Sequence, residues 1–385
     1  MPGATGKSLA NVVLALVSVV VCACGNSSAP VSVDVGRGSL TAAGATFPEP
    51  FYSRAFFAYS QSYPQVTVNY QAVGSGAGIQ QFTKGTVDFG ASDVPMGASD
   101  IAAAGGPSAV VQIPTTLGVV AIAYNVSGIE KLQLDGSTLA AIYLGQIKKW
   151  NDPAIASINV GAKLPGATIT VVHRSDGSGT TYHFTDYLAK VSPDWKSRVG
   201  VSKSVQWPAG IGGKGNDGVA QAISQTDGAI GYVELAYVVQ AKMHQASLKN
   251  RNGKFVQASV GGATAAAAQN ANVSPTNFSI TDEPGDSTYP IAGFSWIILH
   301  ASISDGDKGK AIVYLLKWLV TDGQTYGHDL QYAPLPSSVQ SLVLQNLHGV
   351  TAGGQPVLGR RSSPLGPGWA GRSSVAYPLV RGWRE

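Results

Sequence analysis

The sequence predicts an α/β fold, because strand-like apolar segments alternate along the chain with segments of helical character. An alternating run at 66–70 leads into a glycine-rich segment at 74–78, after which a helix is expected to begin near residue 79. The same pattern returns at 169–172, where a polar loop and an amphipathic stretch at 182–190 follow the strand. Ligands of such folds bind at the carboxyl ends of the strands, so the loops after these strands are where we expect a site.

The remaining elements fit the same fold class. Buried strands are expected at 228–233 and 294–298, and helices at 51–59 and 310–320. Residues 263–274 are rich in Ala, Gln and Asn and fit either a short helix or a surface loop. The length of 385 residues suggests two domains, with three as the alternative.

Composition excludes several classes of function. Only 12% of the residues are charged, and the last 27 residues hold five Arg against one Glu, which leaves the rest of the chain neutral. A neutral body is not expected to bind nucleic acid or a membrane surface. Both Cys, Cys22 and Cys24, lie near the start of the chain, and the six His show no ligand spacing, so neither a disulfide framework nor a metal site is expected.

The N-terminus has the pattern of a bacterial lipoprotein signal. Lys7 precedes an apolar run at 9–23, which is too short for a comfortable membrane span but suits a signal peptide of residues 1–24. Cys24 follows a small residue, as the acylated Cys of such signals does, and residues 25–38 would form a flexible tether. We therefore expect a lipid-anchored protein on the outer face of the cell membrane; the alternative is an ordinary secretory signal.

Three short segments place small residues and hydroxyls where helices should begin. They are Ala45-Thr46-Phe47, Gly74-Ser75-Gly76 and Ser178-Gly179-Thr180. The free N–H groups and partial positive charge of helix N-termini can hold an oxyanion without many cationic side chains, which suits a neutral body. Taken alone, the last segment could be only a helix cap.

Three charged side chains complete this prediction. Arg174 offers a planar fork for two oxygens, and Asp176 is placed to hold that fork in one orientation. Asp93 follows a strand-like stretch, and its carboxylate would tolerate a bound anion only if the anion carries a proton. Hydrogen phosphate has such a proton at neutral pH, whereas sulfate has none. The alternatives are a surface ion pair for Arg174 and a turn cap before Pro95 for Asp93.

One other motif carries less weight. Gly213-Lys214-Gly215-Asn216-Asp217-Gly218 matches the letters of a dinucleotide-binding fingerprint. No clear strand is predicted to lead directly into it, so chance or a helix start is the preferred interpretation.

Residues 39–358 resemble the phosphate-binding proteins that serve bacterial high-affinity phosphate ABC transporters. Six segments match that family in order, and this agreement is far more specific than any single motif. The segments are Leu40–Pro48, Gly85–Asp93, Ile142–Pro153, Arg174–Thr180, Gly213–Gly218 and Gly228–Glu234.

The resemblance implies a set of phosphate contacts and no catalytic residue, metal or cofactor. Asp93 would accept a hydrogen bond from the phosphate, and the forked guanidinium of Arg174 would donate to two phosphate oxygens. Asp176 would pair with Arg174 without touching the phosphate. The implied phosphate-binding residues are Thr46, Phe47, Ser75, Asp93, Arg174, Ser178, Gly179 and Thr180.

The resemblance also implies a two-lobed solute-binding protein with its ligand cleft between the lobes. Lobe I would comprise 39–117 and 288–358, lobe II 118–287, and residues 359–385 would be a disordered extension without a family counterpart. The implied function is extracytoplasmic capture of inorganic phosphate and delivery to the membrane permease subunits of an ABC transporter. The alternatives are a secreted phosphatase of related fold, with Ser75 or Ser178 as nucleophile, and a surface antigen or adhesin.

Overall fold

The computed structural model describes residues 33–359, and from Val35 onward they belong to one compact unit. The predicted signal peptide, the predicted acylation site Cys24, most of the predicted tether and the residues after 359 lie outside the described residues. Over the described part of the chain, no helix is both long and apolar enough to cross a bilayer.

A nine-stranded mixed sheet is the centre of the unit, with the order β2-β1-β3-β12-β4-β8-β6-β7 and with β9 paired to β4. Strands β1, β2 and β3 run parallel to one another, as do β6, β7 and β8, whereas β12 and β4 are antiparallel to their neighbours. The strands are β1 (Gly38–Gly44), β2 (Val66–Ala72), β3 (Phe89–Ser92), β4 (Val110–Asn125), β6 (Thr170–Arg174), β7 (Ile211–Gly213), β8 (Ala229–Glu234), β9 (His244–Gln245) and β12 (Ala292–His300).

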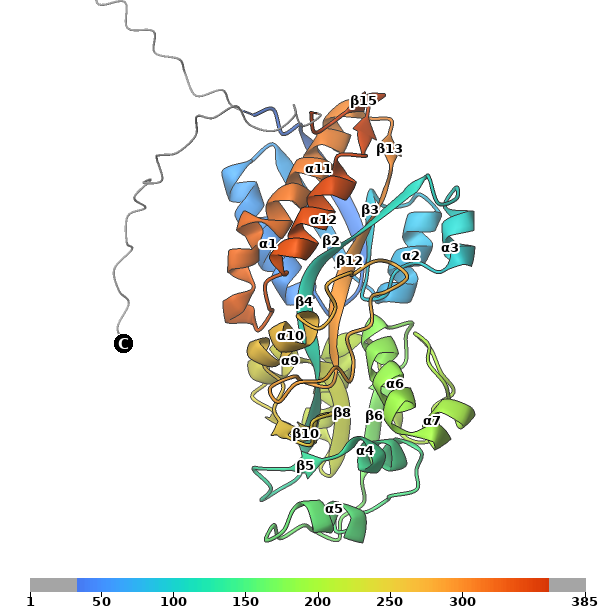
Figure 1. Ribbon diagram of the computed structural model, residues 1–385, viewed down its shortest axis with the longest axis vertical. Helices are drawn as coiled ribbons and strands as arrows, with labels where there is room; N and C mark the ends of the chain where they lie inside the picture. The colour runs from blue at the N-terminus through green and yellow to red at the C-terminus, as the bar shows by residue number, and fades with distance from the viewer. Residues whose placement is uncertain (1–32, 360–385) are drawn as a thin grey trace, which may run out of the picture. The chain divides into compact units, whose positions relative to one another are not determined.

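Strand β4 joins two halves of this sheet. Up to Val119 it pairs with β12, and from Val120 it pairs with β8 (Figure 1). We call the strands β2, β1, β3 and β12 the first half and the strands β8, β6 and β7 the second half. Gly118 and Gly293 face each other close to this change of partner. A Cβ at Gly118 would lie 2.7 Å from the Phe47 ring, so the close packing there requires glycine.

Helices cover both sides of the first half. In Figure 1, α1, α11 and α12 lie together on one side of it, whereas α2 and α3 lie on the other. Helix α1 packs on β2, α2 on β1 and β3, and α11 on β1. These helices are α1 (Glu49–Ser62), α2 (Ser75–Thr83), α3 (Ala98–Ala103), α11 (Gly306–Val320) and α12 (Ser337–Leu347). Between α11 and α12 the chain forms the 3-10 helices η1 (Asp322–Tyr326) and η2 (His328–Leu330).

A second group of helices surrounds the second half. Helix α8 packs on β6, β7 and β8, and α9 and α10 pack on β4. Helix α6 lies between α4 and α7 and touches β8. The helices are α4 (Gly136–Tyr143), α5 (Pro153–Ile158), α6 (Gly179–Val191), α7 (Pro193–Arg198), α8 (Gly215–Gln225), α9 (Leu235–Gln240) and α10 (Val260–Ala267).

Two three-stranded sheets complete the described part. One has the order β11-β10-β5 and the other the order β13-β14-β15. Their strands are β5 (Gln133–Leu134), β10 (Ser247–Lys249), β11 (Phe255–Val256), β13 (Ser302–Ile303), β14 (Thr351–Ala352) and β15 (Gln355–Pro356).

The predicted α/β fold is confirmed, and the differences concern element ends. Helices α2 and α6 begin at Ser75 and Gly179, several residues before the starts that the apolar pattern predicts, because their first turns consist of small residues that show no apolar periodicity. The open question at 263–274 resolves into the end of α10 followed by turns. The expectation that no strand leads into 213–218 is wrong, because the three-residue strand β7, too short to recognise in the sequence, ends at Gly213.

Candidate functional site

The predicted site residues come from loops and helix starts at the carboxyl ends of parallel strands. Thr46 and Phe47 follow β1, and Asp93 follows β3. Arg174 is the last residue of β6, and Ser75 is the first residue of α2. The sheet therefore brings residues from both of its halves to one place.

The N-terminal ends of three helices meet there. The N–H of Gly179, the first residue of α6, donates to Ser75 Oγ at the start of α2 over 3.1 Å. In α8, Asn216 Nδ2 donates to Thr180 Oγ1 over 3.3 Å. The partial positive ends of α2, α6 and α8 thus converge on one buried cluster of polar side chains, an arrangement that favours a bound oxyanion. The members of this cluster are Thr46, Ser75, Asp93, Arg174, Ser178, Thr180, Asn216 and Ser295.

Glycine is needed where the two halves of the sheet approach each other. Gly74 has a φ of 95°, and a Cβ on it would collide with the Asp176 carboxylate. The N–H of Gly76 donates to the carbonyl oxygen of Gly177 over 2.8 Å. A Cβ on Gly179 would collide with Asp93. Backbone from the two halves therefore meets directly beside the cluster.

Arg174 has the orientation that the sequence predicts. Its Nε donates to one oxygen of Asp176 over 2.7 Å and its Nη2 to the other oxygen over 2.5 Å. Burial by itself would raise the pKa of Asp176, but the hydrogen bonds and positive charge of Arg174 lower it below its usual range. Nη1 of the same guanidinium donates to Thr180 Oγ1 over 3.3 Å. The ion pair fixes one edge of the fork and turns its Nη1 toward the cluster.

Asp93 is buried, with 1% of its surface exposed, and has two hydroxyl neighbours. Ser295 Oγ donates to Oδ1 over 2.7 Å, and Ser75 Oγ lies 3.4 Å from Oδ2. Burial raises the pKa of Asp93 to about 7, although Ser295, Arg174 and Ser75 all act to lower it. The side chain is therefore poised between its two protonation states near neutral pH.

The loop that carries Thr46 and Phe47 is fixed by three tyrosine hydroxyls. Tyr70 donates to the carbonyl oxygen of Ala45, Tyr237 to that of Thr46 and Tyr332 to that of Phe47, each over 2.6 Å. The Phe47 N–H in this loop has no acceptor among the described residues. It remains available for an anion.

Ser178, the residue directly before α6, also caps this helix. Its side chain is fully buried, and its Oγ accepts the N–H of Thr181 over 3.0 Å, which caps α6. An Oγ that accepts one N–H still has a proton to donate. The cap expected as an alternative is therefore present and compatible with anion binding.

Two residues of the cluster were not singled out from the sequence. Ser295 lies in the apolar strand β12, where a lone serine could have signalled a polar contact. Asn216 lies in the fingerprint-like segment 213–218; its backbone N–H and its Nδ2 both donate to Thr46 Oγ1, over 3.1 and 2.9 Å. Its Oδ1 accepts the N–H of Glu234 over 2.9 Å. The fingerprint letters thus occur at a helix start that contributes to the cluster.

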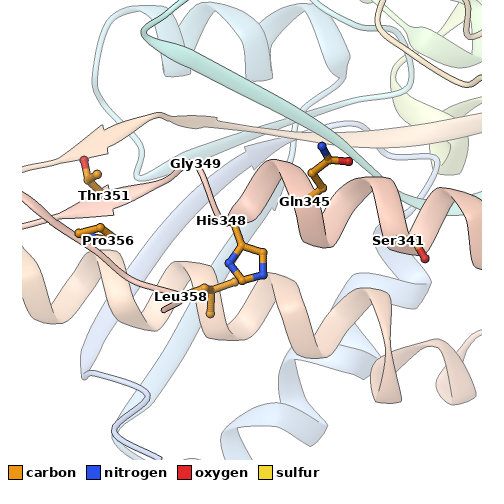
Figure 2. Close-up of a pocket in the computed structure, with 7 residues that line it drawn as sticks. All are labelled: Ser341, Gln345, His348, Gly349, Thr351, Pro356 and Leu358. Carbon is orange, nitrogen blue, oxygen red and sulfur yellow. The ribbon is translucent and has the colours of Figure 1, made fainter. Parts of the chain in front are cut away.

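A surface pocket of about 830 Å³ lies elsewhere, between the end of α12 and strands β14 and β15 (Figure 2). It contains none of the predicted site residues. Its lining residues are Ser341, Gln345, His348, Gly349, Thr351, Pro356 and Leu358. Over residues 33–359, moreover, no group of three His, Cys, Asp or Glu side chains is placed to hold a metal ion.

The family model described as a PBP superfamily domain matches residues 29–320 of the chain. A protein of Xylella fastidiosa (strain 9a5c) named phosphate-binding protein PstS is 44% identical over 324 residues, which are 82% of this chain and 86% of that protein. A protein of Pasteurella multocida with the same name is 44% identical and covers 78% of this chain and 87% of its own length. Among solved structures, the phosphate-binding protein of Stenotrophomonas maltophilia matches with a TM-score of 0.64 at 20% identity, over 80% of this chain and 93% of its own, and therefore shares the fold.

Proposed function

This chain belongs to the PBP superfamily and, within it, to the family of the PstS proteins, and on that premise we propose that it binds inorganic phosphate outside the cytoplasm and delivers it to an ABC transporter. The observation that carries the proposal is the buried cluster of donors around one carboxyl group, Asp93. Such a cluster suits a small oxyanion that has many acceptor oxygens and one proton to give. The relatives carry the name phosphate-binding protein, which agrees with this chemistry.

We propose the following contacts. The Arg174 guanidinium binds two phosphate oxygens, the Phe47 N–H and the helix starts at Ser75 and Gly179 donate to the others, and Asp93 accepts the phosphate proton. Asp176 stays outside the contact shell and holds the fork. The full set of proposed contacts is Thr46, Phe47, Ser75, Asp93, Arg174, Ser178, Gly179 and Thr180.

The proposed lobes follow the change of partner in β4. We propose lobe I at 39–117 and 288–358 and lobe II at 118–287, because β4 leaves β12 for β8 between Val119 and Val120. Closure of the lobes would exclude water from the anion, which strengthens each hydrogen bond to it.

Equilibrium dialysis with labelled phosphate tests the function directly. Purified protein, freed of phosphate by unfolding and refolding, is expected to bind one phosphate per chain. The same preparation is expected not to hydrolyse a chromogenic phosphate ester, since we propose that the Ser75 hydroxyl acts as a hydrogen-bond donor and not as a nucleophile. Turnover without stoichiometric binding would favour the secreted phosphatase, and neither activity would favour an antigen or adhesin.

We propose further that Cys24 carries a lipid anchor that keeps the protein at the cell membrane, where it meets the permease subunits. This rests on the sequence of the signal segment, which lies outside the described residues. A Cys24→Ser protein is expected in the soluble fraction, whereas Cys22→Ser, the matched control, is expected to stay with the membrane. Equal membrane association of the two variants would contradict the anchor at Cys24.

A further inference from the structure

Three hydroxyl groups of the buried cluster share an unusual hydrogen-bond pattern. Ser75 Oγ accepts two N–H groups, those of Asp93 and Gly179, over 3.2 and 3.1 Å. Thr46 Oγ1 also accepts two, and so does Thr180 Oγ1. A hydroxyl has two acceptor lone pairs and one proton. When both lone pairs are occupied, the hydroxyl can only donate.

Asn216 supplies half of these N–H groups. Its backbone N–H and one hydrogen of Nδ2 go to Thr46 Oγ1, and Nδ2 also donates to Thr180 Oγ1 over 3.3 Å. The orientation of the amide is fixed, because its oxygen accepts the backbone N–H of Glu234 over 2.9 Å. The Asn216 side chain is fully buried, so water does not compete for these bonds.

The two threonines have no other acceptor for their hydroxyl protons among the described residues. In every hydrogen bond that Thr46 Oγ1 and Thr180 Oγ1 make among the described residues, the hydroxyl oxygen is the acceptor, and both side chains are buried. A buried hydroxyl proton without an acceptor costs free energy, and a bound oxyanion removes that cost. The arrangement therefore favours the binding of a ligand whose acceptor oxygens reach both threonine hydroxyls at once.

We infer that Asn216 is a positioning residue that strengthens oxyanion binding at the site by forcing the Thr46 and Thr180 hydroxyls to act as donors. This inference deepens the proposed function and rests on it. Asn216 does not need to touch the anion itself. It acts through two hydroxyls that come from different parts of the chain, one after β1 and the other in the first turn of α6.

Two substitutions at this position separate orientation from packing. Asn216→Ala leaves the two hydroxyls free to rotate, and we expect phosphate to bind roughly tenfold to a hundredfold more weakly. Asn216→Asp keeps the shape and the bond to Glu234 N–H, but its carboxylate accepts the two hydroxyl protons and turns them away from the anion. We therefore expect Asn216→Asp to be the weaker binder of the two, although a role in packing alone would make this isosteric change the milder one. Because the added negative charge also repels the anion, the orientation of the hydroxyls is isolated by a double-mutant cycle.

A double-mutant cycle measures how far the effect of Asn216 on phosphate affinity depends on the two threonine hydroxyls, and a role in packing alone would not produce such a dependence. Thr46→Val and Thr180→Val remove the hydroxyls and keep the shape of the side chains. In the background that carries both changes, Asn216→Ala is expected to alter phosphate affinity by less than about threefold, because nothing is left for it to orient. If that triple variant does not fold, the cycle is run with Thr46→Val alone, and with Thr46→Ser, which keeps the hydroxyl and should restore the full effect.

Asn250 offers a matched control. It is a buried Asn whose Nδ2 donates to three backbone carbonyls, those of Gly285, Asp286 and Thr288, and to no hydroxyl. Asn250→Ala is expected to lower the melting temperature and to leave phosphate affinity within about twofold, since the carbonyls that it serves are not part of the cluster.

The measurements are phosphate titrations by calorimetry, together with thermal unfolding of the phosphate-free proteins. Wild-type affinity for Asn216→Ala, or an equal loss with and without the threonine hydroxyls, would overturn the role of Asn216 and leave the proposed function standing. Absence of phosphate binding by the wild type would overturn the proposed function itself. The two failures are therefore distinguishable.

Discussion

Ser295 donates its hydroxyl proton to Asp93 Oδ1 over 2.7 Å, across the pairing of β12 with β3. The bond occupies one carboxylate oxygen and leaves Oδ2 facing Ser75 and the start of α6. It also favours the ionised form of a side chain whose pKa burial has raised to about 7. A residue 202 positions away thus helps to decide in which protonation state Asp93 meets an anion.

The first prediction concerns Ser295→Ala. Without the hydroxyl the pKa of Asp93 should rise further, by roughly one unit, because a hydrogen bond to a charged acceptor is lost. Protonated Asp93 can donate to sulfate, whereas ionised Asp93 repels it, so exclusion of sulfate should be present above the pKa and lost as the pH falls through it. The inhibition constant of sulfate against labelled phosphate, measured from pH 5.5 to 9, should show its transition at higher pH in the variant.

Ser192→Ala is the control for that experiment, since the Ser192 hydroxyl caps α7 and accepts the Trp195 N–H. It should lower stability and leave the sulfate profile in place. The same transition in wild type and Ser295→Ala would mean that the bond between Ser295 and Asp93 does not govern the charge of the site.

The second prediction concerns Arg174, whose side chain is almost completely buried. Arg174→Ala should weaken phosphate binding by at least about 2 kcal/mol, because a charge-assisted fork is lost and the partly buried Asp176 carboxylate loses its cationic partner. Arg174→Lys should restore little of the lost phosphate affinity, since an ammonium group lacks the planar set of donors with which a guanidinium can bind Asp176 and the anion at the same time. Calorimetric titration measures both, and Arg37→Ala, which breaks an exposed pair with Asp307, is the control. Binding close to wild type would place the anion elsewhere.

The third prediction concerns stability and pH. Burial lowers the pKa of His183 to about 4, and its Nε2 has no partner among the described residues. Because the unfolded chain takes up this proton near pH 6.5 and the folded chain does not, His183 should cost stability progressively as the pH falls from about 7 to 4, up to about 3 kcal/mol. Asp93, whose pKa is raised, should act in the opposite direction over the same range.

Urea unfolding of the phosphate-free protein at several pH values checks this. The difference in unfolding free energy between His183→Gln and wild type should grow in favour of the variant as the pH falls from 7 to 4.5. A constant difference would show that His183 titrates alike in the folded and unfolded chains.

The sequence allowed the local part of the site to be predicted, because each local segment carries its own signal. Small residues where a helix should begin predicted Ser75 and Gly179 as site residues. The spacing of Arg174 and Asp176, two residues apart, predicted that the guanidinium is held in one orientation. The same segments matched a family, which turned weak single signals into a specific set.

What the sequence could not provide was contact between distant segments. Asn216 meets Thr46 across 170 residues, and Ser295 meets Asp93 across 202. Tyr332 holds the Phe47 carbonyl from 285 residues away. Sequence periodicity and residue spacing do not predict such contacts, because the contacts depend on the order of the strands in the sheet. The apolar pattern put the starts of α2 and α6 a few residues too late for a different reason, because first turns made of small residues carry no hydrophobic periodicity.

The central claim is that Asp93 accepts the proton of hydrogen phosphate and repels an anion that has no proton to give. The most direct measurement is competition between labelled phosphate and unlabelled sulfate at pH 8, where Asp93 is mostly ionised, in wild type and in Asp93→Asn. Wild type should hold phosphate against a large excess of sulfate, because two like charges in a dry site cost several kcal/mol without a bridging proton. Asp93→Asn, whose amide can donate, should keep much of its phosphate affinity and admit sulfate far better. Sulfate binding by wild type as tight as phosphate binding would contradict both the role of Asp93 and the phosphate assignment.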